Sequence, residues 1–259
     1  MAKSCAYVTN AIHAILGLAL TCAALWLFVE VKQITDLRNS NHYLLDYNLY
    51  WPQAIPWFFI FVGFLVMSIS FCGVFGASKA SKGLVFTHII FVSISIFAAI
   101  TAAIVALVFV DNKVASDFIK DTIWDVYFQS KTNPDVAQAF GSIEKRMQCC
   151  GADGPRDYVN WKDNFPQSCC DVFYHGFLEP YAIDCDITNK MANERHGCTE
   201  VATQYSSIAV KVLSAVSILI AVVGIISLLT SIQLSKKLRR RPRRVENVQV
   251  EFESQKVLL

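Results

Sequence analysis

Cysteine is the residue type whose number and spacing in this chain could support chemistry, because the sequence holds nine of them. Six lie between residues 111 and 211, at positions Cys149, Cys150, Cys169, Cys170, Cys185 and Cys198. An even number of cysteines in a segment outside the cell indicates a disulfide framework, here of three bridges. Six cysteines allow 15 pairings. Because a bond between adjacent cysteines is strained, we expect the two members of each doublet to bond to different partners.

Metal binding and catalysis are the competing interpretations of these cysteines. Zinc ligands usually occur as C-x2-C pairs with a spacer, whereas both doublets consist of adjacent residues. His175 and His196 lie near cysteines that are expected to be oxidised, so no free thiol is left for Cys–His chemistry. We therefore predict no enzyme, no metal and no cofactor in this segment.

The elements that must position the cysteines are four long apolar runs. The 259-residue chain is 54% hydrophobic and only 17% charged, which excludes a disordered chain, a coiled coil or a nucleic-acid binder. Residues 11–29, 55–77, 84–110 and 212–232 contain no Asp, Glu, Lys or Arg. A helix needs ~20 residues to cross ~30 Å of hydrocarbon, so each run is predicted to span a membrane. The first run is too long for the apolar part of a cleaved signal peptide and is interpreted as a signal anchor.

Charge decides which side of the membrane each remaining segment occupies. These segments are residues 1–10, 30–54, 78–83, 111–211 and 233–259. Lys79, Lys82 and the basic run 236–244 lie on the side of both termini, which the positive-inside rule makes cytoplasmic. Residues 111–211 carry 15 acidic and ten basic residues and are predicted to form the one folded extracellular domain. The net charge of +2 is therefore a cancellation between two compartments.

Small residues recur along one stripe of each span, at alternating spacings of three and four. Such stripes let helix backbones approach closely in lipid, and they predict a left-handed bundle. The predicted packing residues are Asn10, Ala14, Gly17, Gly63, Ala99, Ala102, Ala221 and Gly224. His13 and His88 lie within about a turn of the cytoplasmic ends, and we expect both to be interfacial. The near absence of ionisable residues from the spans argues against a transporter or a selective channel.

Helices are also expected in the large loop. Asn133 and Pro134 suit the cap and first position of a helix whose apolar residues recur as far as Met147. Residues 114–129 are predicted to continue the third span outward, and residues 199–207 lead without a helix breaker into the fourth. Residues 151–197 lack periodicity and would need disulfides to hold a shape.

The loop motifs resemble the signature of the tetraspanin family. They are Cys149-Cys150-Gly151, the run 154–158, Trp161 and the PxSC sequence at 166–169. The resemblance covers the whole chain and implies an all-α membrane protein, namely a four-transmembrane-helix bundle with a disulfide-stapled, mainly helical large extracellular loop. It further implies the bonds Cys149–Cys198, Cys150–Cys169 and Cys170–Cys185, with Gly151 supplying a permissive backbone where the chain turns.

The function implied by the resemblance is that of an organiser in the plasma or endosomal membrane. It would cluster other membrane proteins such as adhesion or signalling receptors, copies of itself and other tetraspanins, within membrane lipid and without nucleic acid. Within 171–197, the predicted partner-binding residues are Asp171, Phe173, Tyr174, Phe177 and Tyr181. Cys5 and Cys72 are predicted palmitoylation sites, which the family resemblance also implies. The alternatives are a small four-helix transporter or channel subunit, and a protein that binds a sterol or lipid between its helices.

Overall fold

The computed structural model describes residues 2–37, 51–79, 81–110, 113–170, 173–174, 177–178 and 185–239. The chain forms two compact units. The bundle unit comprises residues 1–25, 57–105 and 213–259, and the loop unit comprises residues 26–56 and 106–212.

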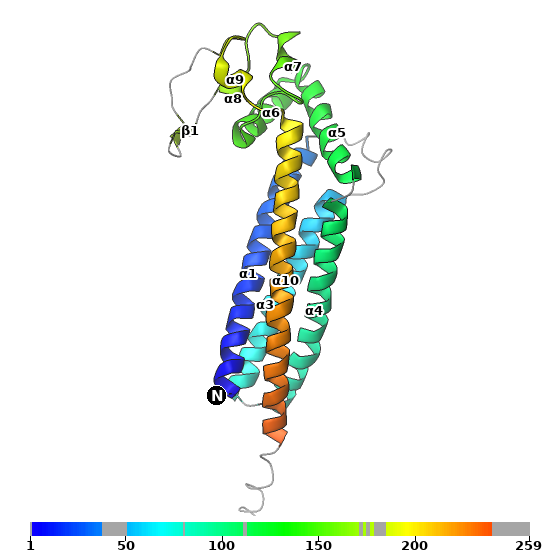
Figure 1. Ribbon diagram of the computed structural model, residues 1–259, viewed down its shortest axis with the longest axis vertical. Helices are drawn as coiled ribbons and strands as arrows, with labels where there is room; N and C mark the ends of the chain where they lie inside the picture. The colour runs from blue at the N-terminus through cyan, green and yellow to red at the C-terminus, as the bar shows by residue number, and fades with distance from the viewer. Residues whose placement is uncertain are drawn as a thin grey trace, which may run out of the picture. The chain divides into compact units, whose positions relative to one another are not determined.

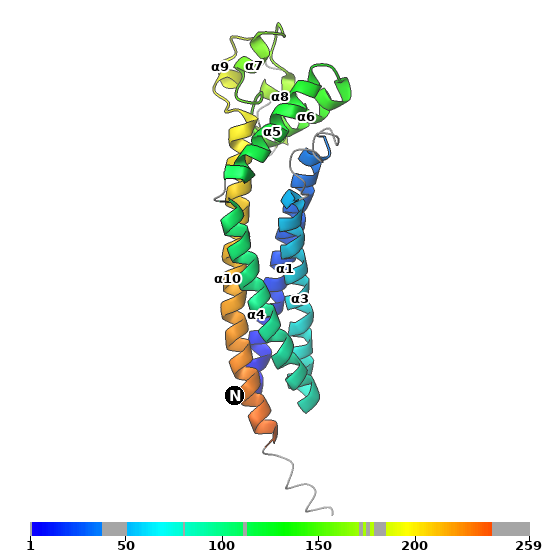
Figure 2. The same ribbon diagram turned by 90° about the vertical axis from the view of Figure 1, so that its right-hand side faces the viewer.

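Four long helices carry the apolar runs: α1 (Ala2–Thr35), α3 (Trp51–Lys79), α4 (Lys82–Val110) and α10 (Cys198–Arg239). All four are long and apolar enough to cross a membrane. They run side by side in Figure 1 and in the perpendicular view of Figure 2. The helix α10 is continuous over 42 residues, which confirms the expectation that the chain enters the fourth span without a break.

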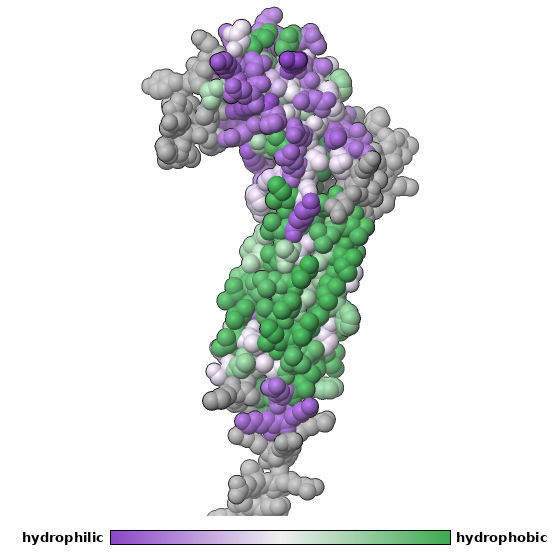
Figure 3. Space-filling view, in the orientation of Figure 1, coloured by the Kyte–Doolittle hydropathy of each residue, from purple (hydrophilic) through white to green (hydrophobic). Residues whose placement is uncertain are grey.

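Hydrophobic side chains cover the face of these helices shown in Figure 3, whereas hydrophilic side chains gather over the large loop. Large apolar side chains are exposed along the helices; Phe97 on α4 is 73% exposed and Phe61 on α3 is 61% exposed. Water would disfavour such a surface, and lipid would not. The fold is therefore the predicted four-helix membrane fold.

Close backbone contact holds α1 against α3 in the bundle unit. A Cβ atom on Gly63 would lie 2.8 Å from the carbonyl oxygen of Gly17, and one on Gly17 would lie 2.9 Å from the carbonyl oxygen of Gly63. On the other helices Ala99, Ala102, Ala221 and Gly224 are buried, while Ala14 on α1 is half-buried. Between α4 and α10, Ser217 Oγ donates to the Ala99 carbonyl at 2.9 Å.

A polar cluster lies inside the bundle unit, and it contradicts the interfacial roles expected for the two histidines. His13 and His88 are 0% and 1% exposed. Ser227 Oγ donates to Asn10 Oδ1 at 2.8 Å and lies 3.3 Å from His88 Nε2. His13 Nδ1 lies 3.2 Å from Ser70 Oγ. The expectation was wrong because His13 follows Asn10 by three residues and so shares its inward face of α1.

The near absence of ionisable residues from the spans is therefore a weaker argument against transport than expected, because the bundle unit buries two histidines together with serines and an asparagine. Their hydrogen bonds join all four helices: Asn10 lies on α1, Ser70 on α3, His88 on α4 and Ser227 on α10.

The loop unit is built mainly from short helices. They are α5 (Lys113–Ser130), α6 (Pro134–Met147), α7 (Arg156–Val159), α8 (Gln167–Cys170) and α9 (Lys190–Asn193). Asn133 Oδ1 accepts from the Asp135 amide at 3.0 Å, which confirms the predicted start of α6. The strands β1 (Phe173–Tyr174) and β2 (Phe177–Leu178) pair antiparallel and are the only strands in the described part of the chain.

Candidate functional site

Three disulfides staple the large loop. They join Cys149 to Cys198, Cys150 to Cys169, and Cys170 to Cys185, which are the pairs that the family resemblance implied. Their Cα–Cα distances are 4.9, 5.1 and 5.8 Å, all within the range that disulfides adopt. Each doublet thus sends its two sulfurs to different partners. The first bridge ties the end of α6 to the start of α10.

Backbone hydrogen bonds support the same junction. The Cys198 amide donates to the Gly151 carbonyl at 3.0 Å, and the Cys150 amide donates to the His196 carbonyl at 3.0 Å. Gly151 has φ of +68°, a left-handed conformation that favours glycine, as the resemblance implied. A Cβ atom there would overlap the carbonyl oxygen of Gly154. The turn after the doublet therefore requires glycine.

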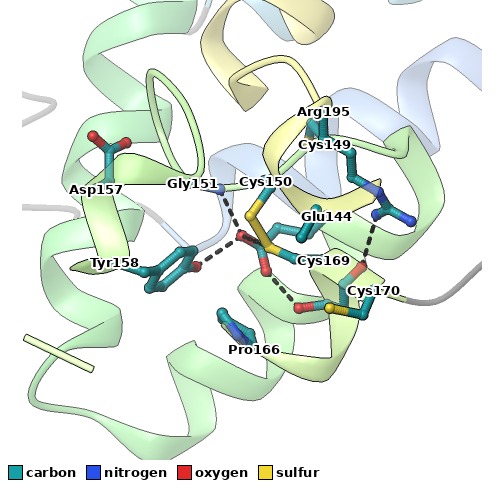
Figure 4. Close-up of a disulfide and its surroundings, with 12 residues drawn as sticks. Glu144, Cys149, Cys150, Gly151, Asp157, Tyr158, Pro166, Cys169, Cys170 and Arg195 are labelled. Atoms are coloured by element: carbon teal, nitrogen blue, oxygen red, sulfur yellow. Dashed lines mark hydrogen bonds between the residues drawn. A yellow bond between two sulfur atoms is a disulfide. The ribbon is translucent and has the colours of Figure 1, made fainter. Parts of the chain in front are cut away.

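A buried carboxylate lies beside the second disulfide, as Figure 4 shows. Glu144 on α6 is 0% exposed. Its Oε1 accepts from the Gly151 amide at 2.8 Å and from the Tyr158 hydroxyl at 2.7 Å, and its Oε2 accepts from the Ser168 hydroxyl at 2.6 Å. Three separate parts of the loop therefore meet on one side chain, which we call the Glu144 hub.

Burial governs the ionisation of this hub. It raises the pKa of the Glu144 carboxyl above its usual range, and the hydrogen bonds from Ser168, Gly151 and Tyr158 only partly offset this. Burial and the neighbouring Glu144 carboxylate also raise the pKa of Tyr158. Sequence reasoning missed Glu144. The available signal was its position four residues after Phe140, which puts a charged residue on the apolar face of α6.

Aromatic residues of α5 and of the signature form another part of the loop core. The Tyr127 hydroxyl on α5 donates to the Asp157 carbonyl at 2.7 Å and accepts from Trp161 Nε1 at 2.8 Å. The ring of Tyr127 also meets the rings of Tyr158 and Trp161 edge-on, at centroid distances of 5.6 and 6.3 Å. Asp157 Oδ2 accepts from the backbone amide of Asp153 at 2.8 Å. These signature residues therefore hold the short turns of the loop in place.

The zinc interpretation does not fit this geometry. Ligand atoms of Glu144, Cys150 and Cys169 lie within 4.8 Å of one another, the one such cluster in the described residues. Both sulfurs belong to the same disulfide. Because a metal would require thiolates, these residues suit a structural bridge instead.

A cavity of about 190 Å³ also lies within the loop unit. Its wall is mostly apolar and includes Leu27 and Ile34 of α1, Phe118 and Ile119 of α5, and Val210 of α10. Glu30, Tyr205 and several hydroxyl side chains complete the lining. No sequence pattern indicated this cavity, because its lining comes from segments far apart in the chain.

Comparison with known proteins decides the family. The model of the family described as "Tetraspanin family" matches residues 2–237. The chain belongs to the tetraspanin family. It is 30% identical over 185 residues to the "23 kDa integral membrane protein" of Schistosoma japonicum, covering 70% of this chain and 76% of that protein. It is also 30% identical to the "CD63 antigen" of Bos taurus, covering 71% and 76%, and 30% identical to the "Leukocyte surface antigen CD53" of Homo sapiens, covering 51% and 58%.

Three of the five predicted partner-binding residues of this tetraspanin lie in the hairpin of β1 and β2. Phe173 pairs with Leu178, and Tyr174 pairs with Phe177. Asp171 and Tyr181 lie outside the described residues. The hairpin lies within the segment that the Cys170–Cys185 bridge closes.

The predicted lipidation sites are placed on two of the long helices of the tetraspanin. Cys5 lies on α1 and Cys72 on α3, and both are exposed free thiols. Cys22 on α1 is likewise a free and exposed thiol.

Proposed function

We propose that this tetraspanin clusters partner membrane proteins, which it binds laterally through its helices and through the hairpin segment 171–184 of its large loop. The observation that carries the proposal is the position of the β1–β2 hairpin. A disulfide closes the segment from Cys170 to Cys185, so the segment is anchored at both ends to the stapled core. Each cross-strand pair contains at least one aromatic residue, a type that is enriched at protein–protein interfaces.

Membership of the tetraspanin family supports a general role as a membrane organiser. The orientation, the membrane, the partners and the lipidation given next are part of the proposal. The large loop lies outside the cell and both termini are cytoplasmic, in the plasma or endosomal membrane. The partners are adhesion or signalling receptors, other tetraspanins and further copies of this chain. Cys5 and Cys72 carry thioester-linked acyl chains that favour clustering; Cys→Ser variants at each should lose the label in an acyl-exchange assay.

The test of the partner surface exchanges residues 171–184 for the matching segment of another tetraspanin. Proximity labelling in the native tissue identifies the partners first, and pull-down with the exchanged chain then compares their recovery. We expect recovery of partners bound through the loop to fall to background. Mass mapping without reduction must show the three bridges intact in the exchanged protein. Unchanged recovery would refute the role of this segment.

A specific observation also favours binding of a sterol or lipid between the helices. The cavity of about 190 Å³ is apolar, and a cavity of ~150 Å³ already holds a benzene molecule. We therefore propose that the cavity takes part of a membrane lipid. A photoactive lipid or sterol should label peptides of α1, α5 and α10 that line the cavity. Labelling confined to exposed positions such as Phe97 would count against it.

A further inference from the structure

One charged residue lines the cavity, and a residue of opposite charge pairs with it from beside the wall. The carboxylate of Glu30 lines the cavity, and its Oε2 accepts from Arg146 Nη1 at 2.8 Å. Arg146 directly precedes Met147, which also lines the cavity. The side chain of Glu30 is 15% exposed and that of Arg146 is 52% exposed. The positive charge is therefore the more accessible member of the pair.

Arg146 keeps hydrogen-bond donors for a ligand. Both of its hydrogen bonds use Nη1, to Glu30 Oε2 and to Gln33 Oε1 at 2.8 Å each. A guanidinium has five N–H donors, and those on Nε and Nη2 make no hydrogen bond to any described residue. Such a fork matches the geometry of a phosphate, which it binds through two parallel hydrogen bonds.

The other side of the charge pair suits a quaternary ammonium group. Tyr205 lines the cavity together with Glu30. Its hydroxyl lies close enough to Glu30 and Arg146 to interact electrostatically with both charges. Its ring meets that of Trp26 edge-on at a centroid distance of 5.8 Å. Aromatic faces and carboxylates are the groups that recognise choline. A purely anionic head group could still bind Arg146, but it would offer no cation to Glu30 and Tyr205 and should bind less tightly.

The location agrees with a lipid head group. The apolar run of α1 ends at residue 29, next to Glu30, and the apolar run of α10 begins at residue 212, close to Val210. Both Glu30 and Val210 line the cavity. The interior of the cavity accepts apolar atoms, but about 190 Å³ is room for part of one chain and not for a whole phospholipid.

We infer that the cavity holds part of one acyl chain of a choline phospholipid, with its phosphate hydrogen-bonded to Arg146 and its trimethylammonium group against Glu30 and Tyr205. This inference rests on the proposal that the cavity binds lipid, and it names the class of lipid. The paired charges select a zwitterionic head group over an anionic one.

The test compares two single-chain lipids that differ only in the head group. Full-length protein in maltoside micelles, which contain no phospholipid, is titrated with lysophosphatidylcholine or lysophosphatidylglycerol of equal chain length, and binding is measured by native mass spectrometry. We expect the choline lipid to bind about tenfold more tightly, a difference of about 1.4 kcal/mol. Arg146→Gln should weaken both lipids. Glu30→Gln should bring the ratio of the two affinities close to one, which loss of structure alone would not do.

A matched pair of variants tests the cavity itself. Ser207→Phe fills the cavity and should abolish binding of both lipids. Ile208→Phe is the control, because Ile208 is the next residue of α10, is 63% exposed and does not line the cavity. Non-reducing mass mapping and the helical circular dichroism must be unchanged in both variants.

Three results would overturn the inference, and they separate it from the broader proposal. Equal affinity for the two lipids in the wild type would show that the charge pair selects nothing. Binding of a photoactive sterol that Ser207→Phe abolishes, with no binding of the choline lipid, would leave a lipid cavity with a different occupant. Insensitivity of every lipid to Ser207→Phe would reject the cavity as a lipid site altogether.

Discussion

Replacing Glu144 by alanine tests whether the hub holds the large loop together. The substitution removes the acceptor of three donors: the Gly151 amide, the Tyr158 hydroxyl and the Ser168 hydroxyl. Tyr158 is only 3% exposed and Gly151 is buried, whereas Ser168 is half-buried and can bond to water. A buried donor without a partner costs about 1–3 kcal/mol, so two of them cost about 2–6 kcal/mol. A folded domain has a total stability of about 5–15 kcal/mol, so Glu144→Ala should make the loop markedly less stable.

Glu144→Gln is the matched variant. Its carboxamide oxygen can still accept from Gly151 and Tyr158, and its amino group can donate to the Ser168 hydroxyl, which accepts as well as donates. We expect this variant to lose less than about 1 kcal/mol. The assay is hydrogen exchange of full-length protein in nanodiscs, followed by mass spectrometry of the peptides covering residues 144–158. The reasoning would be refuted if alanine and glutamine had the same effect on the opening free energy of these peptides.

Comparison of the wild type with Glu144→Gln also tests a predicted pH dependence. Burial raises the pKa of the Glu144 carboxyl, so the folded loop holds this proton more tightly than the unfolded chain does. Binding of this proton stabilises the folded loop fully at a pH below the usual pKa of a carboxyl group. The stabilisation is lost as the pH rises through the raised pKa of Glu144 in the folded loop. Wild-type loop stability minus that of Glu144→Gln should therefore increase as the pH falls. A difference that decreases on acidification would contradict the sign.

Three further substitutions test the packing. Gly151→Ala forces a side chain onto a left-handed residue beside a carbonyl oxygen, and should cost more than about 1–3 kcal/mol; misassigned bridges in non-reducing mass mapping would report it, and a normal pattern with unchanged exchange would oppose it. Gly63→Ala should lower the melting temperature in nanodiscs because the helices must separate, whereas Gly83→Ala, with open space around it, should not; equal melting temperatures would refute close packing. Tyr127→Phe leaves Trp161 Nε1 without its acceptor and should destabilise the loop by about 1–3 kcal/mol in the exchange assay; full protection of the loop would show that the bond is unimportant.

The long apolar runs, the capped start of α6 and the cysteine doublets could be interpreted from sequence because each depends on neighbouring residues. Apolar length determines whether a helix can span lipid. Asn133 and Pro134 act on the backbone within the first turn of α6, and the structure contains that cap. The bridges themselves could not be deduced from counting, since six cysteines allow 15 pairings, and the pairing expected here came from family resemblance.

The sequence by itself therefore determined four membrane-spanning helices and a disulfide-stapled loop of the tetraspanin type, because apolar length, periodicity and local motifs depend only on residues close together in the chain. Only the tertiary structure decided which polar residues are buried. Glu144 became a hub because Gly151, Tyr158 and Ser168 come to it from three turns of the chain. His13 became a buried residue because α3 and α10 pack against its face of α1. The cavity and the Glu30–Arg146 pair beside it exist only where distant segments meet. The environment of a charge depends on atoms distant in sequence, and no local pattern records them.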